Sequence, residues 1–147
     1  MKRPDADDAV SALAEALRPA LLRASRQLRR AAQKAGVSAL DAQLLHAIKQ
    51  APGIGASELA DGEQMTRPSM SSHVKRLQAA GWIAREAAAG DGRRVGIRLT
   101  AAGAKALEAI RRRRNDWLAG RLAGLTFEAR AALAAAAEPL MRLAGDR

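Results

Sequence analysis

The side chains best suited to bind another molecule lie close together in MTRPSMSSHVKRLQAAGW, residues 65–82. This stretch combines hydroxyl, imidazole and cationic groups, namely Thr66, Arg67, Ser69, Ser72, His73 and Arg76. Serine hydroxyls donate or accept hydrogen bonds, an imidazole binds purine edges or phosphates, and a guanidinium binds a phosphate or the edge of a guanine. These residue types therefore suit contact with a nucleic acid.

A helix that begins after Thr66 would separate the polar side chains from an apolar set. At about 100° per residue, Met70, Val74 and Leu77 fall on one side of it. The opposite side and its flanks carry Pro68, Ser69, Ser72, His73, Lys75, Arg76 and Ala79. The first backbone N–H groups after Thr66 would offer a phosphate site. A capped surface helix with solvated polar groups accounts for the same pattern.

The sequence that follows adds a second candidate contact. WIAREAA and VGIRLT are typical of strands and GDGRR of a tight turn, so a hairpin is expected over about 82–99. Arg93 and Arg94 would lie at the shoulder of the turn, where arginines can enter a minor groove or hold phosphates. Taken alone, a hairpin tip kept polar for solubility is the simpler explanation. When the hairpin is considered together with the expected helix, DNA binding becomes the favoured interpretation.

Two helices are predicted ahead of this stretch. SALDAQLLHAIK begins with Ser38 as N-cap and Asp41 three residues later, the spacing of a capping box. ASELADGEQ, residues 56–64, is a short helix candidate with Gly62 as its expected terminator. A helix, a short turn, a second helix and a basic hairpin describe a winged helix-turn-helix, here a head over residues 38–100.

Long amphipathic helices are predicted at both ends of the chain. Residues 5–35 carry apolar side chains three and four positions apart, and Pro19 should kink this helix or divide it in two. Thr100 and Thr126 can cap two further helices within residues 101–147. The simpler explanation is that these helices pack against one another in a bundle within one chain. We favour a dimer, because the assembled head leaves their apolar stripes little to pack against. The expected interface residues are Leu13, Leu17, Leu133, Leu140 and Leu143.

Composition excludes several classes of function. The chain has 147 residues, enough for one domain, and its charge of +10 favours polyanionic partners. No cysteine is present and the two histidines lie far apart, so neither a metal site nor a cofactor is expected. No phosphate loop, nucleophile–base pairing or general acid–base pair is recognisable, so we do not expect an enzyme. With neither an apolar signal core nor a bilayer-spanning run, a cytoplasmic protein without membrane contact is expected.

Between residues 57 and 103, short motifs follow one another in a distinctive order. An LA pair precedes a Thr that opens a helix, an RL pair, a Gly before the first strand, a D-x-R turn and LTxxG. The matching residues are Leu59, Ala60, Thr66, Arg76, Leu77, Gly81, Asp91, Arg93, Leu99, Thr100 and Gly103. In this order they resemble the MarR family of bacterial transcriptional regulators. Lys75 stands where that family often has an acidic residue, and Glu63 and Gln64 replace the frequent Leu and Gly of the turn.

The resemblance implies a mainly α fold with a small β-hairpin wing, formed by a single domain over residues 1–147. It implies a homodimer whose recognition helices enter successive major grooves of a pseudo-palindromic double-stranded DNA operator, with half-site centres about 34 to 36 Å apart. It also implies repression by occlusion, relieved by a small-molecule effector. The expected DNA-binding residues are Thr66, Arg67, Pro68, Ser69, Ser72, His73, Arg76, Arg93 and Arg94.

Two further interpretations stay open. Arg23, Arg26, Arg30 and Lys34 form a basic stripe that is most simply a solvated face; alternatively, part of it lines an effector cleft. The residues that we assign to this cleft are Arg26, Arg30, His46 and Trp117, with a small anionic or aromatic effector. For the whole chain, the alternative to a sequence-specific regulator is a sequence-tolerant architectural DNA-binding protein, because net charge alone supports affinity without specificity.

Overall fold

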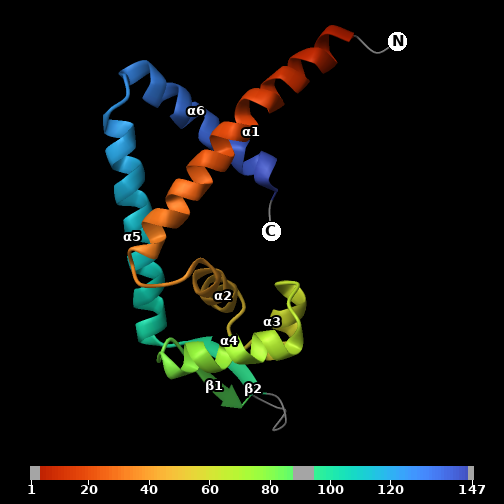
Figure 1. Ribbon diagram of the computed structural model, residues 1–147, viewed down its shortest axis with the longest axis vertical. Helices are drawn as coiled ribbons and strands as arrows, with labels where there is room; N and C mark the ends of the chain where they lie inside the picture. The colour runs from red at the N-terminus through yellow and green to blue at the C-terminus, as the bar shows by residue number, and fades with distance from the viewer. Residues whose placement is uncertain (1–3, 88–94, 146–147) are drawn as a thin grey trace. The chain divides into compact units, whose positions relative to one another are not determined.

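The computed structural model describes residues 4–87 and 95–145. These residues form six helices and one two-stranded antiparallel sheet (Figure 1): α1 (Pro4–Gln33), α2 (Ala39–Gln50), α3 (Ala56–Gly62), α4 (Arg67–Ala79), β1 (Ile83–Ala87), β2 (Val95–Leu99), α5 (Ala101–Ala123) and α6 (Phe127–Ala144). The predicted fold class, mainly helical with a small hairpin wing, is confirmed. Over the described ranges, no helix combines the length and the apolar character that a membrane span requires.

The chain divides into two compact units, residues 1–114 and 115–147, and α5 runs through the boundary. The first unit contains the hydrophobic core, to which α2, α3, α4 and β2 contribute the largest fully buried side chains. These are Leu44, Leu45, Ile48, Leu59, Met70, Val74, Leu77 and Ile97. The apolar faces predicted for the helices of the head therefore pack against one another, as the spacing of their residues indicated.

Helix α1 is a single continuous helix with Pro19 inside it, so of the two predicted effects of this residue, a kink or a division of the helix, the division does not occur. A proline removes only one backbone donor, and here strong helix formers, chiefly Ala, Leu and Arg, continue on both sides. Most of α1 is exposed, whereas Ala31 and Ala32 near its end are buried and Ala32 belongs to the core. The first unit therefore holds α1 chiefly by its C-terminal turns.

Helix α3 ends at Gly62, as the sequence suggested, and its C-terminus forms a Schellman motif whose left-handed residue is Gln64 and not the glycine. The N–H of Met65 donates to the carbonyl of Ala60 (2.9 Å), and the N–H of Gln64 donates to that of Asp61 (3.2 Å). The motif requires a left-handed residue, and Gln64 supplies it with φ of 54°. Helix α4 ends in the same motif with a glycine, because Gly81 has φ of 76°.

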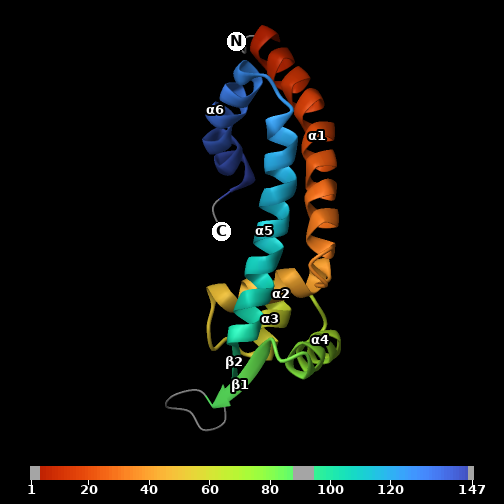
Figure 2. The same cartoon turned by 90° about the vertical axis from the view of Figure 1, so that its left-hand side faces the viewer.

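The hairpin pairs Ile83 with Leu99 and Ala87 with Val95 in antiparallel register. Ile54, in the loop after α2, forms an isolated bridge with Ile97 of β2 and extends this small sheet. The loop approaches β2 closely, because a Cβ placed on Gly96 would lie 2.7 Å from the carbonyl oxygen of Gly53. Figure 2 shows α4 and the hairpin at the same end of the first unit, and the contacts between α4 and β1 agree with this view.

Candidate nucleic-acid interface

Helix α4 is positioned by its cap and by its buried face. Thr66 is the N-cap, and its hydroxyl oxygen accepts a hydrogen bond from the N–H of Ser69 at 3.3 Å. Met70, Val74 and Leu77 are completely buried, so the rotation of the helix about its own axis is fixed. Both features agree with the sequence prediction. The opposite face is consequently held outward.

The predicted DNA-contacting residues of this segment lie on the outward face and its flanks. Ser69 and His73 are half-buried, whereas the exposed residues are Thr66, Arg67, Pro68, Ser72, Lys75 and Arg76. The hydroxyl of Ser72 donates to the carbonyl oxygen of Pro68 at 3.2 Å, which leaves its oxygen lone pairs as acceptors. Within the described part of the chain, Arg67 and Lys75 form no ion pair, so their charges remain available to phosphates.

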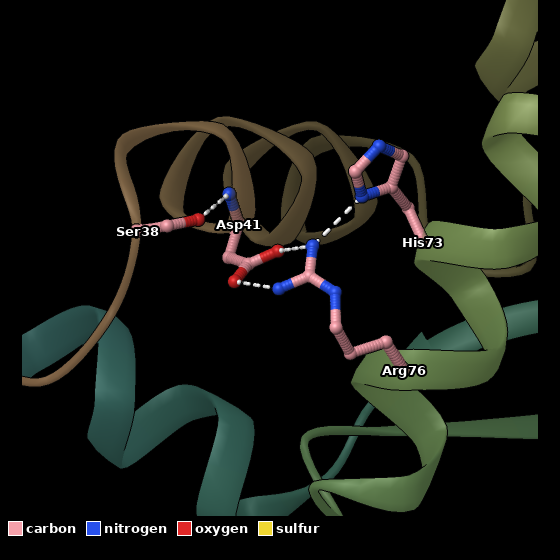
Figure 3. Close-up of polar contacts among 4 residues, drawn as sticks. All are labelled: Ser38, Asp41, His73 and Arg76. Atoms are coloured by element: carbon pink, nitrogen blue, oxygen red, sulfur yellow. Dashed lines mark hydrogen bonds and ion pairs between the residues drawn. The ribbon is translucent and has the colours of Figure 1, made fainter.

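Arg76 makes contacts that the sequence analysis missed (Figure 3). Its Nη1 and Nη2 donate to the two carboxylate oxygens of Asp41 on α2, at 2.7 and 2.6 Å. Nη2 also lies 2.7 Å from Nδ1 of His73, one turn earlier on α4. The Asp41 side chain is 5% exposed and that of Arg76 is 52% exposed. The pair therefore joins a buried carboxylate on α2 to a half-exposed guanidinium on α4.

Asp41 thus has a different role from the one predicted for its carboxylate. Ser38 does cap α2, because its hydroxyl oxygen accepts from the N–H of Asp41 at 3.0 Å. The carboxylate, however, bonds Arg76 instead of completing a capping box at Ser38. A signal was present in the sequence: Asp41 shares a helical face with buried Leu44 and Leu45, and a carboxylate on a buried face needs a partner. A second link from α2 is the hydrogen bond that Gln43 donates to Glu63 in the turn after α3.

Backbone contacts attach the hairpin to the rest of the first unit. The Thr100 hydroxyl donates to the carbonyl of Gly81 at 2.6 Å and accepts from the N–H of Gly103 at 3.1 Å, which caps the first turn of α5 as predicted. A Cβ on Gly103 would lie 2.0 Å from the carbonyl oxygen of Trp82, so only glycine fits there. Arg93 and Arg94, the predicted wing contacts, lie outside the described residues.

Ion pairs neutralise several arginines away from α4. Arg98 on β2 bonds Glu86 on β1 at 3.0 Å, with both side chains exposed. In the RRRR run of α5, Nε and Nη2 of Arg111 donate to the carboxylate of Glu108, each at 2.9 Å. The hydrogen bond from Arg111 lowers the pKa of the Glu108 carboxyl and raises the pKa of Arg111. The positive charge of the chain is therefore partly compensated locally.

No hydrogen bond or ion pair joins Arg26, Arg30 and His46, the three residues of the predicted effector pocket that lie in the first unit, among the residues that the structure describes. Arg26 and Arg30 are exposed on α1, and His46 is exposed on α2 with Nε2 3.5 Å from the amide nitrogen of Gln50. Trp117 belongs to the second unit, where the guanidinium of Arg121 lies 5.6 Å from its ring centroid. This pocket stays a prediction.

The terminal helices carry exposed apolar side chains. Leu13 is 59% exposed, Leu133 48% and Leu143 71%, whereas Leu17 and Leu140 are half-buried. In the second unit, Thr126 caps α6 as predicted, with its hydroxyl oxygen accepting from the N–H of Ala129 at 3.2 Å. No residue of α6 is buried in the isolated chain. These faces therefore remain uncovered within one chain.

Comparisons with known proteins agree with this architecture. A family model described as the MarR family matches residues 35–94. An HTH-type transcriptional regulator of Mycobacterium tuberculosis is 32% identical over 139 residues, which cover 95% of this chain and 97% of that protein. A crystallised protein from Pseudomonas aeruginosa superposes with a TM-score of 0.79 at 31% identity, over 95% of this chain and 98% of that chain.

A DNA complex shares the fold. A mutant of S. aureus MepR bound to an oligodeoxyribonucleotide superposes with a TM-score of 0.69 at 20% identity, over 87% of this chain and 94% of that chain. The family model, the whole-length relative and the shared arrangement of six helices and hairpin all lead to one assignment. This chain belongs to the MarR family of winged helix-turn-helix transcriptional regulators, which are DNA-binding proteins.

Proposed function

We propose that the protein is a dimeric, sequence-specific repressor that binds a pseudo-palindromic double-stranded operator through α4 and the hairpin wing. The observation that carries this proposal is the division of α4 into two faces. Three side chains are completely buried, and short polar groups and cations occupy the exposed side. A helix held in this way can enter a major groove without exposing its apolar face.

Different side chains of α4 suit different parts of DNA. Ser69 and Ser72 are short, which allows the helix backbone to approach base edges closely. Arg67 and Lys75 are exposed cations on the same helix, and Arg67 adjoins the N-cap Thr66. We assign these cations to phosphate contacts, which position a protein on the duplex without reading its sequence. Specificity would then rest on the uncharged side chains.

The exposed leucines of the terminal helices support the homodimer. An amphipathic helix that buries none of its residues in one chain gains stability by covering its apolar face with a partner. A two-fold dimer would place two copies of α4 one helical turn of DNA apart, which is why the operator should be pseudo-palindromic. Arg26, Arg30, His46 and Trp117 remain our proposal for the site of a small anionic or aromatic effector that releases the DNA.

A binding assay tests this function. The purified protein is mixed with the DNA upstream of its own gene, and an equal length of unrelated DNA serves as competitor. A regulator should prefer its operator by about 10³-fold or more at physiological salt, with a two-fold symmetric footprint. Comparable affinity for several unrelated duplexes would instead support an architectural protein, whose affinity follows from the net charge of +10. Genome-wide occupancy would separate that outcome from an operator located elsewhere.

Two variants of α4 separate the assigned roles. Ser72→Ala should weaken binding to the operator while leaving binding to random DNA unchanged, because it removes a hydroxyl and no charge. Arg67→Ala should weaken binding to both duplexes and reduce the slope of log K against log salt by about 1. If Arg67→Ala left that slope unchanged, the phosphate contact assigned to Arg67 would be wrong. For the effector, an Arg26→Ala, Arg30→Ala double variant that responded normally to every anionic inducer would remove these residues from the site.

A further inference from the structure

The contact between Arg76 and His73 determines which ring nitrogen of His73 carries the proton. Nη2 of Arg76 lies 2.7 Å from Nδ1 of His73. A guanidinium has donors only and stays protonated in proteins, so Nδ1 must accept the hydrogen bond. A neutral imidazole that accepts at Nδ1 carries its proton on Nε2. The geometry therefore selects one of the two neutral tautomers.

Arg76 is held in the position that makes this contact. Both of its terminal nitrogens donate to the carboxylate of Asp41, at 2.7 and 2.6 Å, in the bidentate arrangement that fixes the plane of a guanidinium. Asp41 is itself immobilised, because it is 3% exposed and lies in the first turn of α2, where its N–H bonds Ser38. Rotation of Arg76 away from His73 would therefore break its bonds to a buried charge.

The protonated nitrogen of His73 reaches solvent. Figure 3 shows the second ring nitrogen on the side of the imidazole away from the guanidinium. Among the described residues, Nε2 of His73 forms no hydrogen bond. In the same part of the chain, every side-chain nitrogen or oxygen that is buried has a hydrogen-bond partner. His73 is half-buried, so an unpartnered Nε2 must be accessible. This N–H group is consequently an accessible donor on the flank of α4 that has no protein partner among the described residues.

We propose that the Asp41–Arg76 ion pair fixes His73 as a hydrogen-bond donor toward DNA. This inference rests on the proposed function of α4. The partner would be an acceptor atom of the duplex, either a phosphate oxygen or a base acceptor such as a purine N7. The amino groups of adenine and cytosine are donors and would be rejected. Ser72, whose hydroxyl already donates to Pro68, offers an acceptor beside it. Arg76 is then a positioning residue, and its own charge is largely used by Asp41.

Nitrogen NMR of the histidine rings tests the tautomer in the DNA-free protein. The chain has two histidines, so a His46→Gln variant assigns the signals without ambiguity. At about pH 8.5, where histidines are neutral, we expect Nε2 of His73 to be protonated and Nδ1 to be a hydrogen-bond acceptor. In an Arg76→Ala variant the ring should lose this contact, with a shift of its Nδ1 signal. A proton on Nδ1, or identical His73 spectra in the two proteins, would overturn the inference whatever DNA the protein binds.

Substitutions at His73 test the donor role on the duplex that the wild-type protein enriches from a random library. The amide nitrogen of Gln reaches approximately the position of Nε2, whereas the shorter Asn places its amide near Nδ1. His73→Gln should therefore bind within a few-fold of wild type. His73→Asn and His73→Ala should lose roughly tenfold or more, since a hydrogen bond to a charged or strongly polar acceptor contributes about that factor. If Gln and Asn lost affinity equally, the donor at Nε2 would be refuted.

Modified duplexes identify the acceptor. A methylphosphonate at one backbone position removes a phosphate charge and acceptor, and a 7-deazapurine removes one base nitrogen. The position that His73 contacts should weaken wild-type binding about tenfold and His73→Ala binding hardly at all. If a methylphosphonate weakens binding of the wild type but not of His73→Ala, the acceptor is that phosphate. If a deazapurine has this effect, the acceptor is that base nitrogen. Specific binding without this effect at any position would overturn this inference alone, whereas a library with no enriched sequence would overturn the proposed function and the donor role with it.

Discussion

The ion pair between α2 and α4 predicts an asymmetric response to mutation. Arg76→Ala would leave the Asp41 carboxylate without a partner at a site where its side chain is 5% exposed. Asp41→Ala would instead leave a guanidinium that is 52% exposed and can turn to water. Because an unpaired buried charge is costly and a solvated one is not, we expect Arg76→Ala to destabilise the protein more than Asp41→Ala.

The expected sizes follow from the burial of each partner. Removing one member of a fully buried pair costs about 3–5 kcal/mol, and exposed pairs contribute about 0.2–1 kcal/mol. Here only the carboxylate is buried and solvent reaches the guanidinium, so Arg76→Ala should reduce the free energy of unfolding by about 2 kcal/mol. For Asp41→Ala we expect a loss of about 1 kcal/mol, which includes the loss of an acidic group in the first turn of α2.

Urea denaturation at one fixed protomer concentration measures these differences, because the stability of a dimer depends on concentration. The double variant, Asp41→Ala with Arg76→Ala, is the decisive control. It should be about as stable as Asp41→Ala alone and therefore more stable than Arg76→Ala, since no unpaired buried charge remains. Equal losses for the two single variants, or a double variant whose loss is the sum of both, would refute the reasoning.

Three further changes have expected outcomes. Gln64→Gly should raise the free energy of unfolding by about 1 kcal/mol in urea denaturation. Gln64 has a left-handed φ of 54°, a conformation that glycine adopts without steric cost and glutamine does not. An unchanged denaturation midpoint would count against strain at this turn. Gly103→Ala should cost about 2 kcal/mol or more, since the new methyl group meets the Trp82 carbonyl, and a fully stable variant would contradict that close approach. Leu143→Glu should convert the proposed dimer into monomers in sedimentation experiments, because it would bury an unpaired charge in the interface, and an intact dimer would place the interface elsewhere.

The elements of the head could be predicted from local sequence because their causes are local. The spacing of Met70, Val74 and Leu77 determines which face of α4 is buried, and Ser38 and Thr66 cap the helices that follow them. Each of these relations spans only a few residues, where helical periodicity and capping chemistry are strong. The same reasoning located the hairpin between Trp82 and Thr100.

The contacts between elements could not be predicted in the same way. Asp41 and Arg76 are 35 positions apart, and a helical wheel shows the face of a side chain but not the partner that reaches it. The wheel therefore assigned Arg76 to DNA alone. Gln64 is a different case, because the resemblance already identified it as a replacement for a frequent glycine, and the structure shows the left-handed conformation that makes glycine frequent.

The distribution of charge indicates how affinity and specificity are divided at this interface. Several cations are compensated within the chain, in the pairs Arg76–Asp41, Arg98–Glu86, Arg111–Glu108 and Arg142–Glu138. On α4, the exposed cations that form no ion pair with a described residue are Arg67 and Lys75. Charged contacts release counterions on binding, whereas an uncharged hydroxyl such as that of Ser72 releases none. Added salt should therefore lower the affinity for the operator and for random DNA with similar slopes and leave their ratio nearly constant. A ratio that fell steeply with salt would show that charge contributes to sequence discrimination, and it would move the specific contacts from the neutral side chains to the cations.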